Sequence, residues 1–186
     1  MSGLKDKYIK NVIPAMREKF GYKNKMAVPR LEKVTLNSSF GKMASAKAGE
    51  DAAKLGQAIA EDIALIAGQK PVVTTARKSI ATFKLRQGAP LGVKVTLRGQ
   101  KMYDFLDRLV HVVLPRSRDF RGLSPSSIDN QGNLNIGIGE HLFFPEISPE
   151  RSKVPFGLEV TVTISAKSRE EGLEMFRQLG FPFGAS

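Results

Sequence analysis

The stretch Gly157-Leu-Glu-Val-Thr-Val-Thr-Ile-Ser165 alternates apolar and polar residues along its whole length. Successive side chains of a β-strand point to opposite faces of its sheet, so this pattern predicts a strand with one apolar and one polar face. A strand buried on both faces of a parallel sheet would instead be a continuous apolar run. The stretch therefore favours an antiparallel sheet with one buried face and one face left open.

Two other stretches, Arg30–Asn37 and Val93–Arg98, alternate in the same way. In both, valines and leucines occupy one face and lysine, threonine, asparagine or arginine the other. Pro71–Thr74 is predicted to be a short strand, and Ser126–Ile138 a hairpin that turns near Asn130 and Gly132.

Apolar residues at three-to-four-residue spacing predict four helices between these strands. The first runs from Leu4 to Phe20, with Ile9 in its apolar stripe and a kink or fresh start at Pro14. The others cover Ser45–Ala67, a stripe from Met102 that stops before Pro115, and a last helix begun by the capping pair Ser168 and Glu171. The predicted fold class is α+β: an antiparallel sheet with helices packed on one face and a polar, basic open face. Residues 1–186 are expected to form a single domain.

The positive charge is concentrated in one window. No Asp or Glu occurs between Asp62 and Asp104, whereas the window holds eight Lys and Arg residues of a chain with net charge +11 and pI near 10.0. Charge of one sign favours a surface for a polyanion, and nucleic acid is the leading partner, ahead of an anionic membrane. The alternative is a solvated basic strand and loop.

Several classes of function are disfavoured. The chain has no cysteine, so thiolate catalysis and zinc–thiolate sites are excluded. Its histidines have no metal-binding spacing, since His111 lies among apolar residues as a partly buried structural histidine and His141 stands alone in a loop. Glu50, Asp51, Glu61 and Asp62 have the spacing of a solvated helix face, and no catalytic set or cofactor site is evident. No apolar run approaches the roughly 20 residues that span a bilayer, so no membrane partner is expected.

Several blocks resemble one known family. They are Gly68-Gln-Lys-Pro71, Ala76-Arg-Lys-Ser-Ile80, Phe83-Lys-Leu-Arg-Gln-Gly88, Val95-Thr-Leu-Arg-Gly99, Arg118-Asp-Phe-Arg-Gly122, Phe144-Pro-Glu-Ile147 and Gly180-Phe-Pro-Phe183. In this order they are similar to the bacterial large-subunit ribosomal protein number five, the universal 5S rRNA-binding family. Two positions depart from the family pattern: Ser38-Ser-Phe-Gly41 replaces a Gly-Val-Gly-like turn, and His141 stands where glutamine is common.

The resemblance implies a non-enzymatic protein without cofactor or metal, located on the large subunit of cytoplasmic ribosomes. It implies attachment of 5S rRNA in the central protuberance, contact with P-site tRNA, and a bridge to a small-subunit head protein. The 23S rRNA and neighbouring large-subunit proteins are further implied partners.

Site residues follow from the same resemblance. The rRNA-binding set is Lys33, Thr35, Asn37, Gln69, Lys70, Lys94, Thr96 and Arg98. The tRNA-binding set is Thr75, Arg77, Lys78, Ser79, Lys84 and Arg86, on a protruding basic loop expected over residues 75–92. The subunit-bridge set is Glu140, His141, Phe144, Glu146 and Ile147. A free-standing nucleic-acid architectural protein is the alternative, and an RNA-modifying enzyme a third class.

Overall fold

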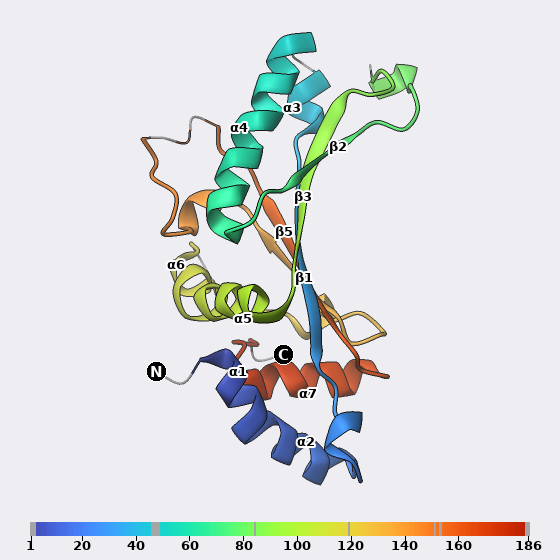
Figure 1. The fold of residues 1–186 in the computed structure, drawn as a ribbon, viewed down its shortest axis with the longest axis vertical. Helices are drawn as coiled ribbons and strands as arrows, with labels where there is room; N and C mark the ends of the chain where they lie inside the picture. The colour runs from blue at the N-terminus through green and yellow to red at the C-terminus, as the bar shows by residue number, and fades with distance from the viewer. Residues whose placement is uncertain are drawn as a thin grey trace. The chain divides into compact units, whose positions relative to one another are not determined.

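The computed structural model of the chain describes residues 3–45, 49–83, 85–118, 120–150, 152 and 154–184. Within these residues one sheet is formed by the strands β1 (Leu31–Ser39), β2 (Val72–Thr75), β3 (Pro90–Leu97), β4 (Leu134–Ile138) and β5 (Leu158–Ile164). The strand order is β2-β3-β1-β5-β4, and the sheet is antiparallel (Figure 1). The predicted α+β class is therefore confirmed.

Contacts within the chain gather into two compact units. Unit 1 comprises Met1–Val34, Leu97–Ile136 and Val160–Ser186, and unit 2 comprises Thr35–Thr96 and Gly137–Glu159. The strands β1, β3, β4 and β5 each have residues in both units. The expectation of a single domain stays a prediction.

Unit 1 contains most of the helices. They are α1 (Leu4–Lys7), α2 (Ile13–Phe20), α5 (Gly99–Arg108), α6 (Leu114–Arg116) and α7 (Arg169–Leu179), with the short helical turns η2 (Lys25–Ala27) and η5 (Pro125–Ser127). Helix α7 packs against α2 and α1 packs against α5. The turn near Asn130 and Gly132 forms as predicted, and the Asp129 carboxylate there accepts hydrogen bonds from the amides of Gln131 and Asn133. The predicted hairpin is shorter than expected, because η5 takes up its first residues and Ile128 pairs with Leu134 in an isolated bridge.

Two π-helical segments join the helices of unit 1 near their prolines, and Pro14 lies in the first turn of α2, which is one of the two outcomes predicted for it. Segment η1 (Tyr8–Val12) joins α1 to α2, and η4 (Leu109–Val113) joins α5 to α6. Each ends two residues before a proline, Pro14 or Pro115. A proline removes one backbone donor and crowds the preceding turn, and a wider π turn accommodates both.

This arrangement corrects three predictions. The third helix does not stop before Pro115 but continues through it to Arg116. Ile9, in the first π segment, is 53% exposed and is not part of the apolar stripe. His111 lies in the second π segment with its side chain exposed, and its Nδ1 is 3.0 Å from the carbonyl oxygen of Asp107.

Unit 2 contains α3 (Gly41–Ser45), α4 (Gly49–Ala67) and the turns η3 (Ala81–Phe83) and η6 (His141–Phe143). Helix α4 lies along one side of β1 and β3 (Figure 1). Its predicted inner residues, Leu55, Ile59, Ile63 and Ile66, are all buried, as are the inward residues Leu36, Val93 and Val95 of the strands. Burying each such side chain contributes about 1.5–3 kcal/mol, which fixes the face that the sheet turns toward α4. The opposite face is left to the polar residues.

Candidate nucleic-acid interface

The outward residues of the strands in unit 2 form a polar surface, called here the open face. It consists of Thr35, Asn37 and Ser39 on β1, Val72 and Thr74 on β2 with the preceding Gln69 and Lys70, Lys94 and Thr96 on β3, Gly137 on β4 and Glu159 on β5. All of them are exposed or half-buried, whereas the neighbours Leu36, Ser38, Val93 and Val95 are buried. The alternation that the sequence predicted therefore holds along this face.

Six of the eight residues predicted to bind rRNA belong to unit 2: Thr35, Asn37, Gln69, Lys70, Lys94 and Thr96. Lys33 and Arg98 belong to unit 1, where Lys33 is half-buried and Arg98 is exposed. The Arg98 guanidinium donates a hydrogen bond of 3.5 Å to the carbonyl oxygen of Glu32.

Gln69 reaches the open face because α4 ends abruptly. Gly68 has a φ of +62°, which closes the helix in a left-handed conformation and directs the chain back toward β2. The Gln69 side-chain amide then donates a hydrogen bond of 3.2 Å to the carbonyl oxygen of Thr96. Together with Lys70, Val72, Thr74 and Lys94 these residues line a hollow of about 400 Å³, called here the Gln69 hollow.

Asn37 borders a second recess, the Asn37 hollow. Its amide nitrogen donates to the Glu159 carboxylate over 3.4 Å. The hollow measures about 480 Å³ and is also lined by Ser39, Gly137, Ile138, Gly139, Gly157 and Leu158. A Cβ atom added at Gly137 or Gly139 would meet no atom within 4 Å, so these glycines leave open space above the backbone.

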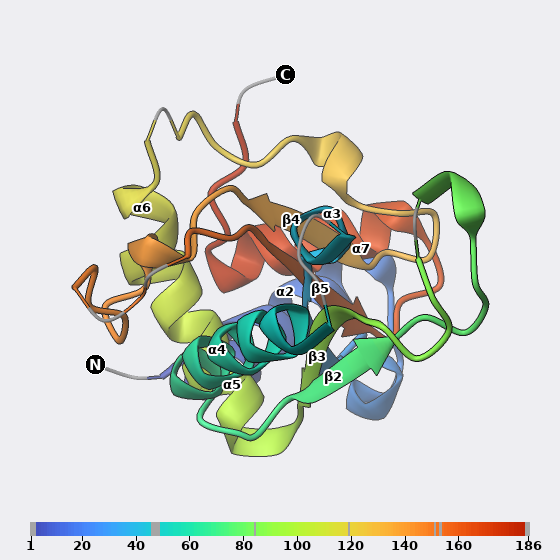
Figure 2. The ribbon, with the colours of Figure 1, turned by 90° about the horizontal axis from the view of Figure 1, so that it is seen from above.

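The predicted basic loop is a paired hairpin, called here the arm, that extends away from β2 and β3 (Figure 2). Thr75 and residues 90–92 belong to the strands, so the arm covers 76–89 rather than 75–92. Ala76 donates to Ala89 over 2.8 Å and Gly88 donates to Ala76 over 3.0 Å, and Ile80 and Leu85 exchange both of their backbone hydrogen bonds.

Among the predicted tRNA-binding residues, Thr75, Arg77, Lys78, Ser79 and Arg86 are exposed. Lys84 lies outside the described residues. The Ser79 hydroxyl accepts from the Gln87 amide and so connects the two sides of the arm. Phe83 is 64% exposed, beside a hollow of about 640 Å³ that Ser39, Gly41, Lys42, Thr82, Leu85 and Leu91 also line.

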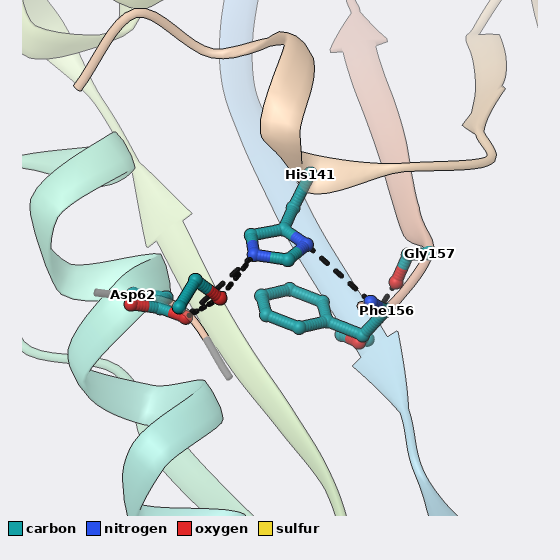
Figure 3. A network of polar contacts seen from close by, with 6 residues as sticks. Asp62, His141, Phe156 and Gly157 are labelled. Atoms are coloured by element: carbon teal, nitrogen blue, oxygen red, sulfur yellow. Dashed lines mark hydrogen bonds and ion pairs between the residues drawn. The ribbon is translucent and has the colours of Figure 1, made fainter. Parts of the chain in front are cut away.

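The predicted subunit-bridge residues surround a buried histidine. His141 is completely buried, and Phe144 and Ile147 are buried as well, whereas Glu146 is half-buried and Glu140 is exposed. The His141 ring stacks on Phe156, with 3.9 Å between ring centroids and 9° between planes (Figure 3).

The histidine is part of a hydrogen-bonded chain, which corrects the expectation that it stands alone. The Phe156 amide donates to Nδ1 over 3.3 Å, which leaves the ring proton on Nε2. Nε2 then lies 2.7 Å from the Ser152 hydroxyl, which donates to the Asp62 carboxylate over 2.8 Å (Figure 3). The Asp62 side chain is only 15% exposed. The sequence had predicted that Asp62 lies on a solvated helix face, and this prediction is wrong.

Burial lowers the pKa of His141, and the nearby Asp62 carboxylate offsets part of this effect. The order of the three side chains matters for chemistry. The serine hydroxyl lies between histidine and aspartate and points its proton at the carboxylate, whereas a serine nucleophile needs its proton directed at the histidine. The network therefore serves to connect residues 141–156 to helix α4.

Glu159 is an acidic residue of the open face to which the sequence assigned no role. Its position on the polar side of β5 was visible in the alternation, but a carboxylate is not an expected RNA ligand, and only the structure brings it to Asn37. Among the residues that the structure describes, no group of three or more His, Cys, Asp or Glu side chains is placed to hold a metal, and no helix is long and apolar enough to span a membrane.

Comparison with known proteins identifies the family. Residues 24–86 match the family described as ribosomal protein L5, and residues 90–183 match the model described as the C-terminus of the same ribosomal family. The chain is 51% identical over 183 residues to the large ribosomal subunit protein uL5 of Carboxydothermus hydrogenoformans, and 49% identical over 183 residues to that of Halothermothrix orenii. Each alignment covers 98% of this chain and 99% of the relative. The uL5 protein of Kosmotoga olearia is 50% identical over 180 residues, which are 97% of this chain and 95% of the relative. These matches extend over almost the whole sequence, and the chain belongs to the ribosomal protein L5 family, whose members are structural, non-enzymatic proteins.

Proposed function

We propose that this protein is a structural constituent of the large ribosomal subunit that binds 5S rRNA through the open face of unit 2. The family membership supports the ribosomal role, because the relatives carry the name large ribosomal subunit protein. The observation that carries the RNA-binding role is the placement of two amides, Asn37 and Gln69, in hollows of a face that also bears Lys70 and Lys94.

The two residue types on this face suit different parts of an RNA. Lysine ammonium groups attract phosphates and position the chain without regard to sequence. Amides carry both a donor and an acceptor, so they pair with base edges and 2′-hydroxyl groups, which a lysine reads poorly. A face with both kinds of group suits a folded RNA better than a uniform polyanion.

The test is the affinity of the purified protein for 5S rRNA as a function of salt. Each phosphate neutralised by Lys or Arg releases counterions, with a log–log slope of about 0.7–0.9 per contact. The affinity should therefore fall steeply between about 50 and 200 mM salt, and an affinity that stays flat over this range contradicts the proposal.

Alanine variants locate the contact. Asn37→Ala and Gln69→Ala should each weaken 5S rRNA binding by about threefold to tenfold, the usual worth of one hydrogen bond. The control is Gln57→Ala, since Gln57 is an exposed amide on α4 whose hydrogen bond is to Glu61 of the same helix. If the two variants lose thermal stability in proportion to binding, the amides support the fold and do not contact RNA.

The arm is the proposed contact for P-site tRNA. The arm extends from the sheet (Figure 2). Arg77, Lys78 and Arg86 on it are exposed, and their charge suits a phosphate backbone. Exchange of both Arg77 and Lys78 for Glu, with tRNA retention measured on reconstituted ribosomes, tests this assignment.

The loop at Glu140–Ile147 is the proposed contact for a small-subunit head protein. Because His141, Phe144 and Ile147 are buried, their role in such a bridge is to hold the loop, and the exposed Glu140 is its contact residue. The 23S rRNA and neighbouring large-subunit proteins complete the set of proposed partners in cytoplasmic ribosomes. Co-sedimentation with large subunits separates this proposal from a free-standing architectural protein, which would remain in the soluble fraction.

A further inference from the structure

The two amides of the open face share one feature of geometry. The Asn37 side chain directs its nitrogen at the Glu159 carboxylate, 3.4 Å away, and the Gln69 side chain directs its nitrogen at the Thr96 carbonyl oxygen, 3.2 Å away. Both partners are acceptors only, since a carboxylate and a backbone carbonyl carry no proton at neutral pH. Chemistry thus fixes the orientation of both amides, with the NH₂ group turned toward the protein.

The carbonyl oxygens of the two amides consequently point away from their protein partners. In the part of the chain that the structure describes, neither Asn37 Oδ1 nor Gln69 Oε1 receives a hydrogen bond. Asn37 borders a hollow in which Gly137 and Gly139 present backbone without side chains, so a ligand can approach closely. Each hollow therefore offers an acceptor to whatever enters it.

We propose that Glu159 is a positioning residue that fixes the Asn37 amide, so that the open face presents acceptors to hydrogen-bond donors of the RNA. Donors of this kind are ribose 2′-hydroxyls and the amino groups of bases, whereas phosphates only accept. The inference rests on the proposed function, because it specifies how the RNA contact of the open face is made. Gln69, held by the backbone of β3, needs no side chain to orient it.

The inference opposes the simple electrostatic expectation. A carboxylate on an RNA-binding face repels phosphates, so its removal should tighten binding if charge alone matters. If Glu159 instead fixes the Asn37 amide, its removal should weaken binding despite the gain in positive charge. The two expectations differ in sign, which makes the variant decisive.

The first experiment measures 5S rRNA affinity for three variants at one salt concentration. Glu159→Ala should bind about threefold to tenfold more weakly than wild type, the worth of about one hydrogen bond. Glu159→Gln keeps an acceptor oxygen for the Asn37 amide while losing the charge, so it should bind at least as tightly as wild type. Glu61→Ala makes the same change in net charge at an exposed position on α4 and should leave the affinity within about twofold of wild type.

The second experiment identifies the donors. Pools of 5S rRNA carrying scattered 2′-deoxy nucleotides, or inosine in place of guanosine, are bound to the protein, and the positions depleted from the bound fraction are mapped. Depletion in the 2′-deoxy pool assigns ribose hydroxyls, and depletion in the inosine pool assigns guanine amino groups. In either pool the depletion should disappear at one or more positions when the protein is Asn37→Ala, a variant that leaves Glu159 in place.

The outcomes separate this inference from the proposed function. If the wild-type chain does not bind 5S rRNA, the proposed function fails and this inference fails with it. If wild type binds but Glu159→Ala binds more tightly, or if neither pool shows depletion that depends on Asn37, only the positioning role of Glu159 is overturned.

Discussion

Replacement of His141 by glutamine should remove a pH dependence from the stability of the protein. His141 is completely buried, and the Phe156 amide donates to its Nδ1. Protonation would place a second N–H group opposite that amide, and burial disfavours the charged ring, so the pKa of His141 in the folded protein lies below its ordinary value of 6.5.

The sign of the effect follows from proton linkage. Between the lowered pKa of His141 in the folded state and about 6.5 in the unfolded state, the unfolded chain binds the extra proton. The contribution of His141 to the free energy of unfolding is therefore fully present above a pH of about 6.5. Below that pH the free energy of unfolding falls, by at most about 1.4 kcal/mol per pH unit for one proton. Glutamine does not titrate, so the His141→Gln variant should lack this contribution.

The assay is urea unfolding of wild type and variant, followed by circular dichroism in steps from pH 8 to pH 5 or so. The difference in unfolding free energy between the two proteins should change with pH below about 6.5 and be constant above it. His111→Gln is the matched control, because it makes the same exchange at a histidine whose side chain is 58% exposed rather than buried. Parallel curves for wild type and His141→Gln would refute the reasoning.

Three further predictions concern unit 1 and the arm. Ser168→Ala should destabilise the protein by about 1 kcal/mol in urea unfolding, because the Ser168 hydroxyl caps α7 by accepting from the Glu171 amide. Gly172→Ala should destabilise it as well, since a Cβ there would lie 2.5 Å from the Gly132 carbonyl oxygen, and an overpacking cost of about 1–3 kcal/mol exceeds the gain in helix propensity of about 1 kcal/mol. The double exchange of Arg77 and Lys78 for Glu should leave 5S rRNA affinity nearly unchanged in a binding titration but loosen P-site tRNA on ribosomes.

The sheet was predictable from the sequence because one of its faces is buried. A strand such as β5, with Val160 and Val162 fully buried between half-buried threonines, must alternate in sequence, and a shift by one residue would exchange the faces. The inner face of α4 was predictable for the same reason, since Ile59 and Ile63 recur at helical spacing and are buried together. The spacing of apolar residues along the sequence shows which side chains are buried, and in these elements the buried side chains determine which face packs against the core.

The continuation of a unit 1 helix through Pro115 and the environment of His141 were not predictable in this way. Pro115 usually ends a helix, and no local pattern signals that a π turn will admit it. His141 contacts Ser152 and Asp62, which are 11 and 79 residues away in sequence. The residues next to His141 in the sequence therefore give no indication of these contacts. The pairing of Asn37 with Glu159 spans 122 residues and was missed for the same reason.

The hairpin pairing of the arm has a consequence for the thermodynamics of any contact it makes. Restricting one residue of a flexible chain costs about 1–2 kcal/mol of conformational entropy. Hydrogen bonds between Ala76 and Ala89 at the base of the arm, and between Ile80 and Leu85 further out, restrict much of the backbone during folding. A partner that docks on the arm therefore meets a preorganised backbone, and the loss of conformational entropy on binding offsets less of the favourable interaction free energy.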